Sequence, residues 1–377
     1  MDKYNQKPRG VNYMEKSYRP KSYDFYNMME NQAFTGPMFL GKDLEYVEQG
    51  YVITEDNKII DCGEGKISGA KKHSIIPAFI NAHTHVGDHF MREKCLGMTL
   101  ESACAKRGIK ENYMSAASEY TIVVGMKAAI CEMLRTGTCC FTDFREGGIH
   151  GINLLKKVLM DFRYRGMRAK IFGRPLYHGE NFIDDCDGYG MRSIRAEKIN
   201  MRLGRTLGIH VCESKPGELE KALEFKPDFL VHMNSATPEE LKKAASLNMP
   251  IIICPRSNAY FSLSQPDIPA MLNEGISLSL GTDNAMTNTA SMPSEMEYAY
   301  RTNMKNVSAK EILKMATINP AKLFNWNCGI IEKGKDANLI LLDEHFLKTP
   351  DPYATTVLRL QAQKSQMMFG GKFAHYY

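Results

Sequence analysis

The sequence of 377 residues lacks several features that would place it in a specialised class of protein. It contains ten cysteines but no CxxC pair, and most of them lie within apolar runs such as KAAICEML and IIICPRS. This pattern is typical of reduced, buried thiols, where cysteine behaves as a small hydrophobic residue. Cys139 and Cys140 are adjacent and would point to opposite faces of a strand, which argues against a shared metal ion.

The chain also lacks a long hydrophobic run. Its first residues, MDKYNQKPRG, contain no apolar signal region, and the longest apolar stretch, TIVVGMKAAI, is short and interrupted by Lys127. We therefore expect a cytoplasmic protein that does not enter a membrane. The net charge of +5 is spread along the chain and forms no basic stripe, so nucleic-acid binding is not expected.

No internal repeat and no low-complexity linker divides the chain, but its patterning changes twice. Residues 1–38 are polar and rich in Tyr, Asn, Lys and Met, and we interpret them as an N-terminal extension. Residues 39–75 have a strand-like pattern with a hairpin turn predicted at Asp56-Asn57, and residues 329–377 return to strands. These two segments together predict one small composite β domain.

Between these segments, over residues 76–328, apolar strands alternate with amphipathic helices. The predicted strands are IIPAFINAH, CCFTDF, AKIFGRP, GIHVCES, DFLVHMN, PIIICPRS and ISLSLGTD, with a weaker candidate at GYGMRSI. This alternation indicates a parallel sheet, and eight units favour a closed (β/α)8 barrel of the TIM type. An open doubly wound sheet is the alternative, but no GxGxxG follows any of these strands. The predicted fold class is α/β.

Histidine and aspartate residues lie where the predicted strands end. The residues at the ends of the first, fifth, sixth and eighth strands are His83 and His85, His210, His232 and Asp283. The active site of such a barrel lies at the C-terminal ends of its strands, and residues i and i+2 share a face. A single strand-end histidine is more often a packed core residue, but this convergence is difficult to explain by packing. Imidazoles with one carboxylate are what a divalent ion such as Zn²⁺ selects.

Eight stretches of the chain resemble the amidohydrolase superfamily, within it the branch of cytosine, guanine and S-adenosylhomocysteine deaminases and triazine hydrolases. They are PAFINAHTH, EMLRTGTCCFTDF, GIHVCES, LVHMN, CPRSN, LGTDNAMTN, ATINPAKLF and EKGKDANLILLD, and they cover the chain from about residue 40 onward. Ala78 stands where the family usually has Gly, and Asn81 and Asn338 stand where Asp is usual. None of these three is an expected ligand.

The resemblance implies one divalent metal ion, with Zn²⁺ expected and Fe²⁺ as the alternative, bound by His83, His85, His210 and Asp283. Asp283 would also accept the proton of a water molecule, and Glu213, in an HxxE motif, would carry a proton to a ring nitrogen. His232 would stabilise the tetrahedral intermediate. Dinuclear relatives use a carboxylated lysine, for which Lys170 is the candidate, but it lies near the start of its strand.

Weaker candidates for substrate contact follow several strands: Phe90, Phe144, Arg145, Arg174, His178, Arg256 and Asn258. The two phenylalanines could stack on a flat ring, whereas the last two residues belong to CPRSN and are at least as easily structural.

The implied activity is hydrolytic deamination of an aminated heterocycle, a nucleobase, nucleoside or related small molecule, with release of ammonia. Hydrolysis of a ring C–Cl, C–S or amide bond at the same site is the alternative, and a catalytically silent barrel is a weaker one. A homodimer is the default oligomer.

Overall fold

The computed structural model describes residues 32–105, 108–162, 166–175, 183–194 and 205–374. Most of the predicted N-terminal extension and the substrate-contact candidate His178 therefore lie outside the described residues. Within the described ranges, no helix is long and apolar enough to cross a membrane.

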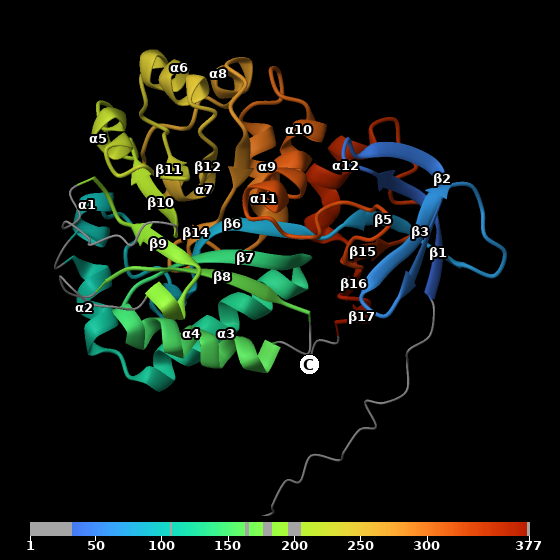
Figure 1. The fold of residues 1–377 in the computed structure, drawn as a ribbon, viewed down its shortest axis with the longest axis horizontal. Coiled ribbons are helices and arrows are strands. Elements are labelled where there is room, and N and C mark those ends of the chain that lie inside the picture. Colours follow the sequence, from blue (N-terminus) through green and yellow to red (C-terminus); the bar gives the residue numbers. More distant parts are fainter. Residues whose placement is uncertain (1–31, 106–107, 163–165, 176–182, 195–204, 375–377) are drawn as a thin grey trace, which may run out of the picture. The chain divides into compact units, whose positions relative to one another are not determined.

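The larger sheet of the described chain is a barrel of parallel strands that follow one another in chain order (Figure 1). Its strands are β6 Phe79–His85, β7 Thr138–Arg145, β8 Arg168–Gly173, β9 Gly188–Met191, β10 Thr206–Val211, β11 Phe229–His232, β12 Ile251–Ile253, β13 Leu278–Leu280 and β14 Asp283–Asn284. The last two are pieces of one strand, because β13 pairs with β12 and β14 pairs with β6. This pairing closes the sheet and confirms the predicted (β/α)8 class.

Helices cover the outside of the barrel (Figure 1). They are α3 Glu119–Arg135, α4 Gly148–Phe162, α5 Leu219–Leu223, α6 Pro238–Ser246, α8 Ile268–Asn273, α9 Met292–Arg301, α10 Ala309–Met315 and α11 Ile318–Leu323. The short helix α7 Pro255–Tyr260 follows β12 at the C-terminal ends of the strands. The start of α6 is the capping box expected from TPEEL. The Thr237 hydroxyl accepts a hydrogen bond from the Glu240 backbone N–H, and the Glu240 carboxylate accepts one from the Thr237 backbone N–H. The barrel interior is filled by Phe144, Phe172 and Phe229.

The connection from β6 to α3 is the part of the fold that lies next to the predicted metal ligands of β6. It contains the 3-10 helix η1 Val86–Met91 and the short helices α1 Leu100–Cys104 and α2 Ile109–Ala116. A second 3-10 helix, η3 Ile183–Asp185, precedes β9.

The smaller sheet joins strands from both ends of the described chain. In spatial order they are β17 Lys372–Phe373, β16 Gln366–Phe369, β15 Leu339–Leu342, β5 Ser74–Pro77, β1 Gln32–Leu40, β2 Glu45–Glu55 and β3 Lys58–Glu64, with β4 Lys71–Lys72 beside β1. The link between the two ends is β15, which pairs antiparallel with both β5 and β16. The helix α12 Pro352–Arg359 and the 3-10 helix η4 Leu360–Ala362 connect β15 to β16.

Two local predictions for this sheet have different outcomes. The hairpin turn at Asp56-Asn57 is confirmed, because Glu55 pairs with Lys58 across it. The boundary predicted after residue 38 is too late, because β1 begins at Gln32 and pairs with β2 from that residue onward. The residues before position 39 show no regular alternation of apolar and polar side chains, so the start of β1 was not predicted, although its Phe34 is buried in the core of the smaller sheet.

Candidate active site

The histidines and the aspartate predicted from the sequence converge at the C-terminal ends of the barrel strands. His83 and His85 lie in β6, His210 in β10 and His232 in β11, and Asp283 begins β14. None of the five is more than 7% exposed. His232 and Asp283 also have positive φ angles of 78° and 59°. Such backbone is uncommon for residues with side chains and is concentrated at functional sites.

The potential ligand atoms of these side chains lie close together. One atom from each of His83, His210, His232 and Asp283 lies within 4.8 Å of the other three. His83 Nε2 is 3.1 Å from His210 Nε2 and 3.3 Å from Asp283 Oδ1. His85 Nε2 is 3.4 Å from the same oxygen. Ligands arranged tetrahedrally at about 2.1 Å from a zinc ion are about 3.4 Å apart, so these spacings fit one ion.

The protonation of the imidazoles also fits a metal. His210 Nδ1 lies 3.0 Å from the carbonyl oxygen of Met191, which only accepts hydrogen bonds. Nδ1 therefore carries the proton, and the lone pair of Nε2 faces the other ligands. His85 Nδ1 lies 2.8 Å from Glu146 Oε1, which leaves its Nε2 free in the same way. Burial lowers the pKa of His85 to about 3 and also lowers that of His210, so both rings are neutral.

Asp283 is oriented by a residue that the sequence analysis did not single out. Ser257 Oγ donates a 2.6 Å hydrogen bond to Asp283 Oδ2, which leaves Oδ1 facing the imidazoles. Burial opposes ionisation of Asp283, but the nearby imidazoles of His83, 3.3 Å from Oδ1, and His232 hold its pKa well below its usual range. Ser257 could have been identified from the sequence, because it belongs to the CPRSN stretch that follows a predicted barrel strand.

Glu213 faces His232 at the mouth of the barrel. Its Oε1 is 3.5 Å from His232 Nε2, and its side chain is 20% exposed. Burial raises the pKa of Glu213, and the opposing effect of His232 does not cancel the shift. The backbone carbonyl of Glu213 accepts hydrogen bonds from Asn234 Nδ2 at 2.6 Å and Ser235 Oγ at 3.2 Å. A carboxyl group held beside an imidazole, with a raised pKa, is suited to carrying a proton.

Glu146 connects His85 to a group of cations. Its carboxylate lies 2.7 Å from Lys110 Nζ, 2.7 Å from Arg145 Nη2 and 3.8 Å from Arg174 Nη1. Burial opposes ionisation of Glu146, but Lys110 and His85 hold its pKa well below the usual range. A carboxylate behind a metal-binding histidine fixes the ring and its tautomer.

Lys110 was not among the residues predicted for the site, because it lies on α2 and is distant in the sequence from every strand end. Its Nζ also lies 2.9 Å from Asp88 Oδ2, so the buried ammonium group joins two carboxylates. Burial opposes the charged form of Lys110, yet Asp88 and Glu146 raise its pKa above the ordinary value. Lys110 thereby ties the β6–α3 connection to the site.

Two of the predicted substrate-contact residues, Phe144 and Arg145, are buried against other residues of the site. Phe144 has no exposed surface, and its ring packs edge-on against His83 at 4.5 Å between centroids. Arg145 is also fully buried and lies between Asp143, at 3.4 Å, and Glu146. In this structure both side chains therefore support neighbouring residues of the site, and their contact with a substrate stays a prediction.

The two CPRSN residues, Arg256 and Asn258, also make contacts within the protein. The Arg256 backbone N–H donates to Glu295 Oε1 at 2.9 Å, and its guanidinium donates to the Thr289 carbonyl at 3.2 Å. Asn258 is buried and donates to Asn234 Oδ1 at 3.3 Å, and thereby supports the residue that holds the Glu213 backbone. These contacts agree with the structural alternative, and substrate contact by either residue stays a prediction.

Phe90 and Arg174 remain candidates for substrate contact. Phe90 is only partly buried and lies in η1, against Gly125 of α3. Arg174 directly follows β8, and its side chain is 20% exposed.

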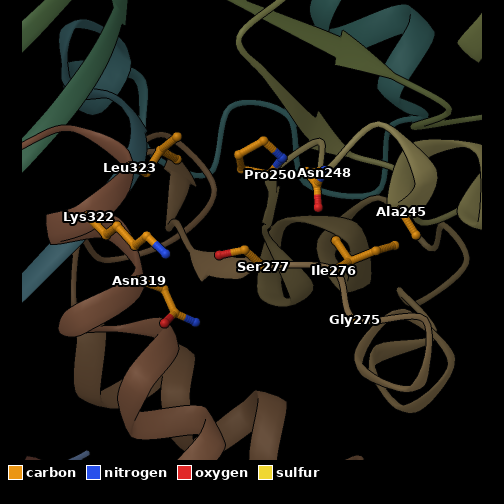
Figure 2. A pocket seen from close by; sticks show the side chains of 9 residues that line it. All are labelled: Ala245, Asn248, Pro250, Gly275, Ile276, Ser277, Asn319, Lys322 and Leu323. Carbon is orange, nitrogen blue, oxygen red and sulfur yellow. The ribbon is translucent and has the colours of Figure 1, made fainter. Parts of the chain in front are cut away.

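A pocket of about 410 Å³ lies elsewhere on the barrel (Figure 2). Pro250 and Ser277 in its lining directly precede β12 and β13, so it opens at the N-terminal ends of the strands. Its only ionisable lining residue among those described is Lys322. This pocket contains none of the metal-ligand chemistry, which lies at the opposite end of the strands.

Comparisons with known proteins agree with this arrangement. The Amidohydrolase family matches residues 74–189 and 190–372. An uncharacterised protein of Methanocaldococcus jannaschii is 30% identical over 320 residues, which are 73% of this chain and 82% of that protein. A 5-methylthioadenosine/S-adenosylhomocysteine deaminase of Thermoanaerobacter pseudethanolicus is 27% identical over 328 residues, 74% of each chain.

Among solved structures, a zinc-bound adenosine deaminase from Xanthomonas campestris has the same fold, with a TM-score of 0.74. The sequence identity is 18%, and the match covers 91% of this chain and 92% of that one. With a family match that spans most of the sequence and a barrel whose strand ends carry the histidines and the aspartate, the chain belongs to the amidohydrolase family.

Proposed function

We propose that this amidohydrolase is a metal-dependent deaminase that replaces the amino group of an aminated heterocycle with oxygen and releases ammonia. The observation that carries the proposal is the position of Glu213, 3.5 Å from His232 and beside the predicted ligand set. A carboxyl group there can deliver a proton to a ring nitrogen, which deamination requires. The relative named as a 5-methylthioadenosine/S-adenosylhomocysteine deaminase supports this choice and makes purine nucleosides the first compounds to test.

The proposed ligands of the metal are His83, His85, His210 and Asp283, and the proposed ion is Zn²⁺. The compact group of potential ligand atoms contains His232 and not His85. A physical argument is therefore needed to decide which of these two histidines binds the metal and which takes part in catalysis. His85 is assigned to the metal because Glu146 lies behind its Nδ1, as is usual for a metal-binding histidine. His232 is assigned to catalysis because its Nε2 faces Glu213. A divalent ion at such a site lowers the pKa of a water molecule to near neutrality.

The remaining steps belong to the side chains. Asp283 Oδ1, which has no hydrogen-bond donor among the described residues, accepts the proton that the attacking water loses. Glu213 protonates the ring nitrogen next to the attacked carbon, and it later helps ammonia leave by accepting the hydroxyl proton of the intermediate as the carbonyl group forms. The proton held by Asp283 passes to the leaving amino group, so both carboxyl groups return to their starting states. His232 stabilises the charge on the oxygen of the tetrahedral intermediate. The net reaction consumes one water molecule and yields a carbonyl group and ammonia.

The substitution Glu213→Gln tests this function. Glutamine keeps the size of the side chain but cannot carry a proton, so the variant should retain its metal and bind substrate. Its kcat should fall by at least about 100-fold, the lower end of what a positioned acid–base group contributes. Ammonia release from aminated purines, pyrimidines, pterins and their nucleosides is the measurement.

The matched control is Glu224→Gln, because Glu224 is exposed and lies on the same connection between β10 and β11. It should leave kcat unchanged. Near-normal turnover in Glu213→Gln would remove the main support for deamination. Release of chloride or thiol by the wild-type enzyme, without ammonia, would favour the other hydrolytic reactions.

A further inference from the structure

Three buried cysteines meet at the end of the barrel opposite the histidines. Cys139 and Cys140 lie at the start of β7, and Cys328 lies between α11 and β15. The three Sγ atoms all lie within 4.8 Å of one another, and Cys140 Sγ is 3.6 Å from Cys328 Sγ. None of the three residues is more than 2% exposed. The proposed deaminase reaction uses none of them, so their proximity needs a separate explanation.

The proximity of Cys139 to Cys140 contradicts the expectation that adjacent strand residues face opposite sides. The pairing of β6 with β7 explains the difference, because Phe79 pairs with Thr138 whereas the next residue, Ile80, pairs with Cys140. Cys139 is therefore the extra residue of a β-bulge and is released from the regular alternation. Bulges re-aim side chains in this way, and here the bulge brings a third sulfur atom to the cluster.

A cation and a carboxylate lie beside the cluster. Arg168 Nη2 is 3.6 Å from Cys140 Sγ, and Arg168 Nη1 is 2.8 Å from Asp336 Oδ2. The Arg168 side chain is 41% exposed, so this guanidinium next to the sulfur atoms is in contact with solvent. Burial raises the pKa of the Cys139 and Cys140 thiols well above the ordinary value, and the Arg168 guanidinium opposes this shift at Cys140. Hydrogen bonds from the thiols of Cys139 and Cys140 hold the pKa of Cys328 well below its ordinary value.

We propose that Cys139, Cys140 and Cys328 bind one thiophilic metal ion, Cu⁺ or Zn²⁺, at a site separate from the active site. Thiolates select these ions over the harder Mg²⁺ and Ca²⁺. With a metal–sulfur bond of about 2.3 Å, two thiolates of a tetrahedral site are about 3.8 Å apart, close to the 3.6 Å observed here. Binding releases the thiol protons to solvent, and the charge of Arg168 offsets part of the resulting negative charge.

The identity of the ion depends on the number of ligands. Within the described ranges, the cluster contains three cysteines and no histidine or carboxylate as a further member. Three sulfur atoms alone suit Cu⁺, whereas Zn²⁺ would need a fourth ligand from solvent. Either ion would join β7 to the segment that enters β15, and would therefore stabilise the connection between the barrel and the smaller sheet.

Titration of the reduced, full-length protein with Cd²⁺ tests the site, because thiolate-to-Cd²⁺ charge transfer gives an ultraviolet absorption band. The proposed active-site ligands include no cysteine, so Cd²⁺ bound there gives no such band, and the cysteine variants below separate the cluster from the other thiols. It should saturate at one Cd²⁺ per chain, and competition with Zn²⁺ and Cu⁺ should show which ion binds more tightly. Cys328→Ala should weaken binding by at least about 100-fold, beyond the loss expected for a supporting residue.

The matched control is Cys131→Ala, a half-buried cysteine of α3 that lies outside the cluster. It should retain the band, and both variants should keep deaminase activity within about twofold of the wild type. If Cys328→Ala does not fold, alkylation of the wild-type protein replaces it, since bound Cd²⁺ should protect these three cysteines. No band in the reduced protein, or an unchanged band in a folded Cys328→Ala, would overturn the proposal. A disulfide between Cys140 and Cys328 without metal binding after reduction would overturn it as well.

Discussion

His210 Nδ1 lies 3.0 Å from the carbonyl oxygen of Met191, and this contact determines which nitrogen of the ring can bind a metal. Met191 ends β9 and His210 lies in β10, which pairs with β9 in parallel register. The carbonyl oxygen accepts the Nδ1 proton, so Nε2 faces His83 as a lone-pair donor. The strand that was the weakest candidate in the sequence thus orients one of the proposed ligands.

Metal analysis should find one divalent ion in the active site. In the Cys328→Ala background, which removes the cysteine site, the stoichiometry should be close to one per chain. His210→Ala should lose this ion and the activity together, whereas His150→Ala should lose neither, because His150 is an exposed residue of α4. A stoichiometry near two with a carboxylated lysine would contradict the mononuclear site. Lys170 lies in the first half of β8 and away from the strand end.

Removing the hydroxyl group of Ser257 should weaken metal binding without abolishing it. Ser257→Ala deletes the 2.6 Å hydrogen bond to Asp283 Oδ2, so the carboxylate is no longer oriented toward the imidazoles. Metal affinity should fall by about 10- to 100-fold, as for other residues that support a ligand. Competition with a chelator measures the change. Ser115→Ala on the exposed face of α2 is the control, and equal affinities in the two variants would exclude this role for Ser257.

The C-terminal strands should be required for stability. Deletion of residues 368–377 removes Met368 and Phe369, neither of which has exposed surface. Loss of a buried phenylalanine alone costs about 3–5 kcal/mol, so the free energy of unfolding should fall by at least about 3 kcal/mol. Urea denaturation measures this value, with the exposed Lys364→Ala as the control. Unchanged stability after the deletion would contradict a composite β domain built from both ends.

Glu295 should make stability depend on pH. Burial raises its pKa to about 7, and the opposing effect of Arg256 is smaller. Because the folded-state pKa lies above the unfolded one, the contribution to stability is fully present below the unfolded pKa of about 4.5 and is lost as the pH rises toward 7. The free energy of unfolding should therefore fall over this range. Glu295→Gln should reduce that slope, and identical pH profiles for variant and wild type would exclude a raised pKa.

The sequence by itself determined the fold class and the chemistry of the proposed metal ligands. Alternating strand and helix patterns are local properties of the chain, and strand-end positions follow from them, so His83, His210 and Asp283 could be grouped without coordinates. The family resemblance rested on the same stretches, and the family match confirms it.

Only the tertiary structure determined which neighbouring side chains contact the ligands and which are buried. Lys110 reaches Glu146 from a helix of the β6–α3 connection, and Phe144 and Arg145 are buried by contacts between strands. The position of Cys139 in the cysteine cluster depends on a one-residue change of register between β6 and β7. The contact between Cys140 and Cys328 joins residues that are 188 positions apart in the chain. Local periodicity contains no information on such pairings, because they arise from the packing of distant segments and from a bulge that breaks the alternation of a strand.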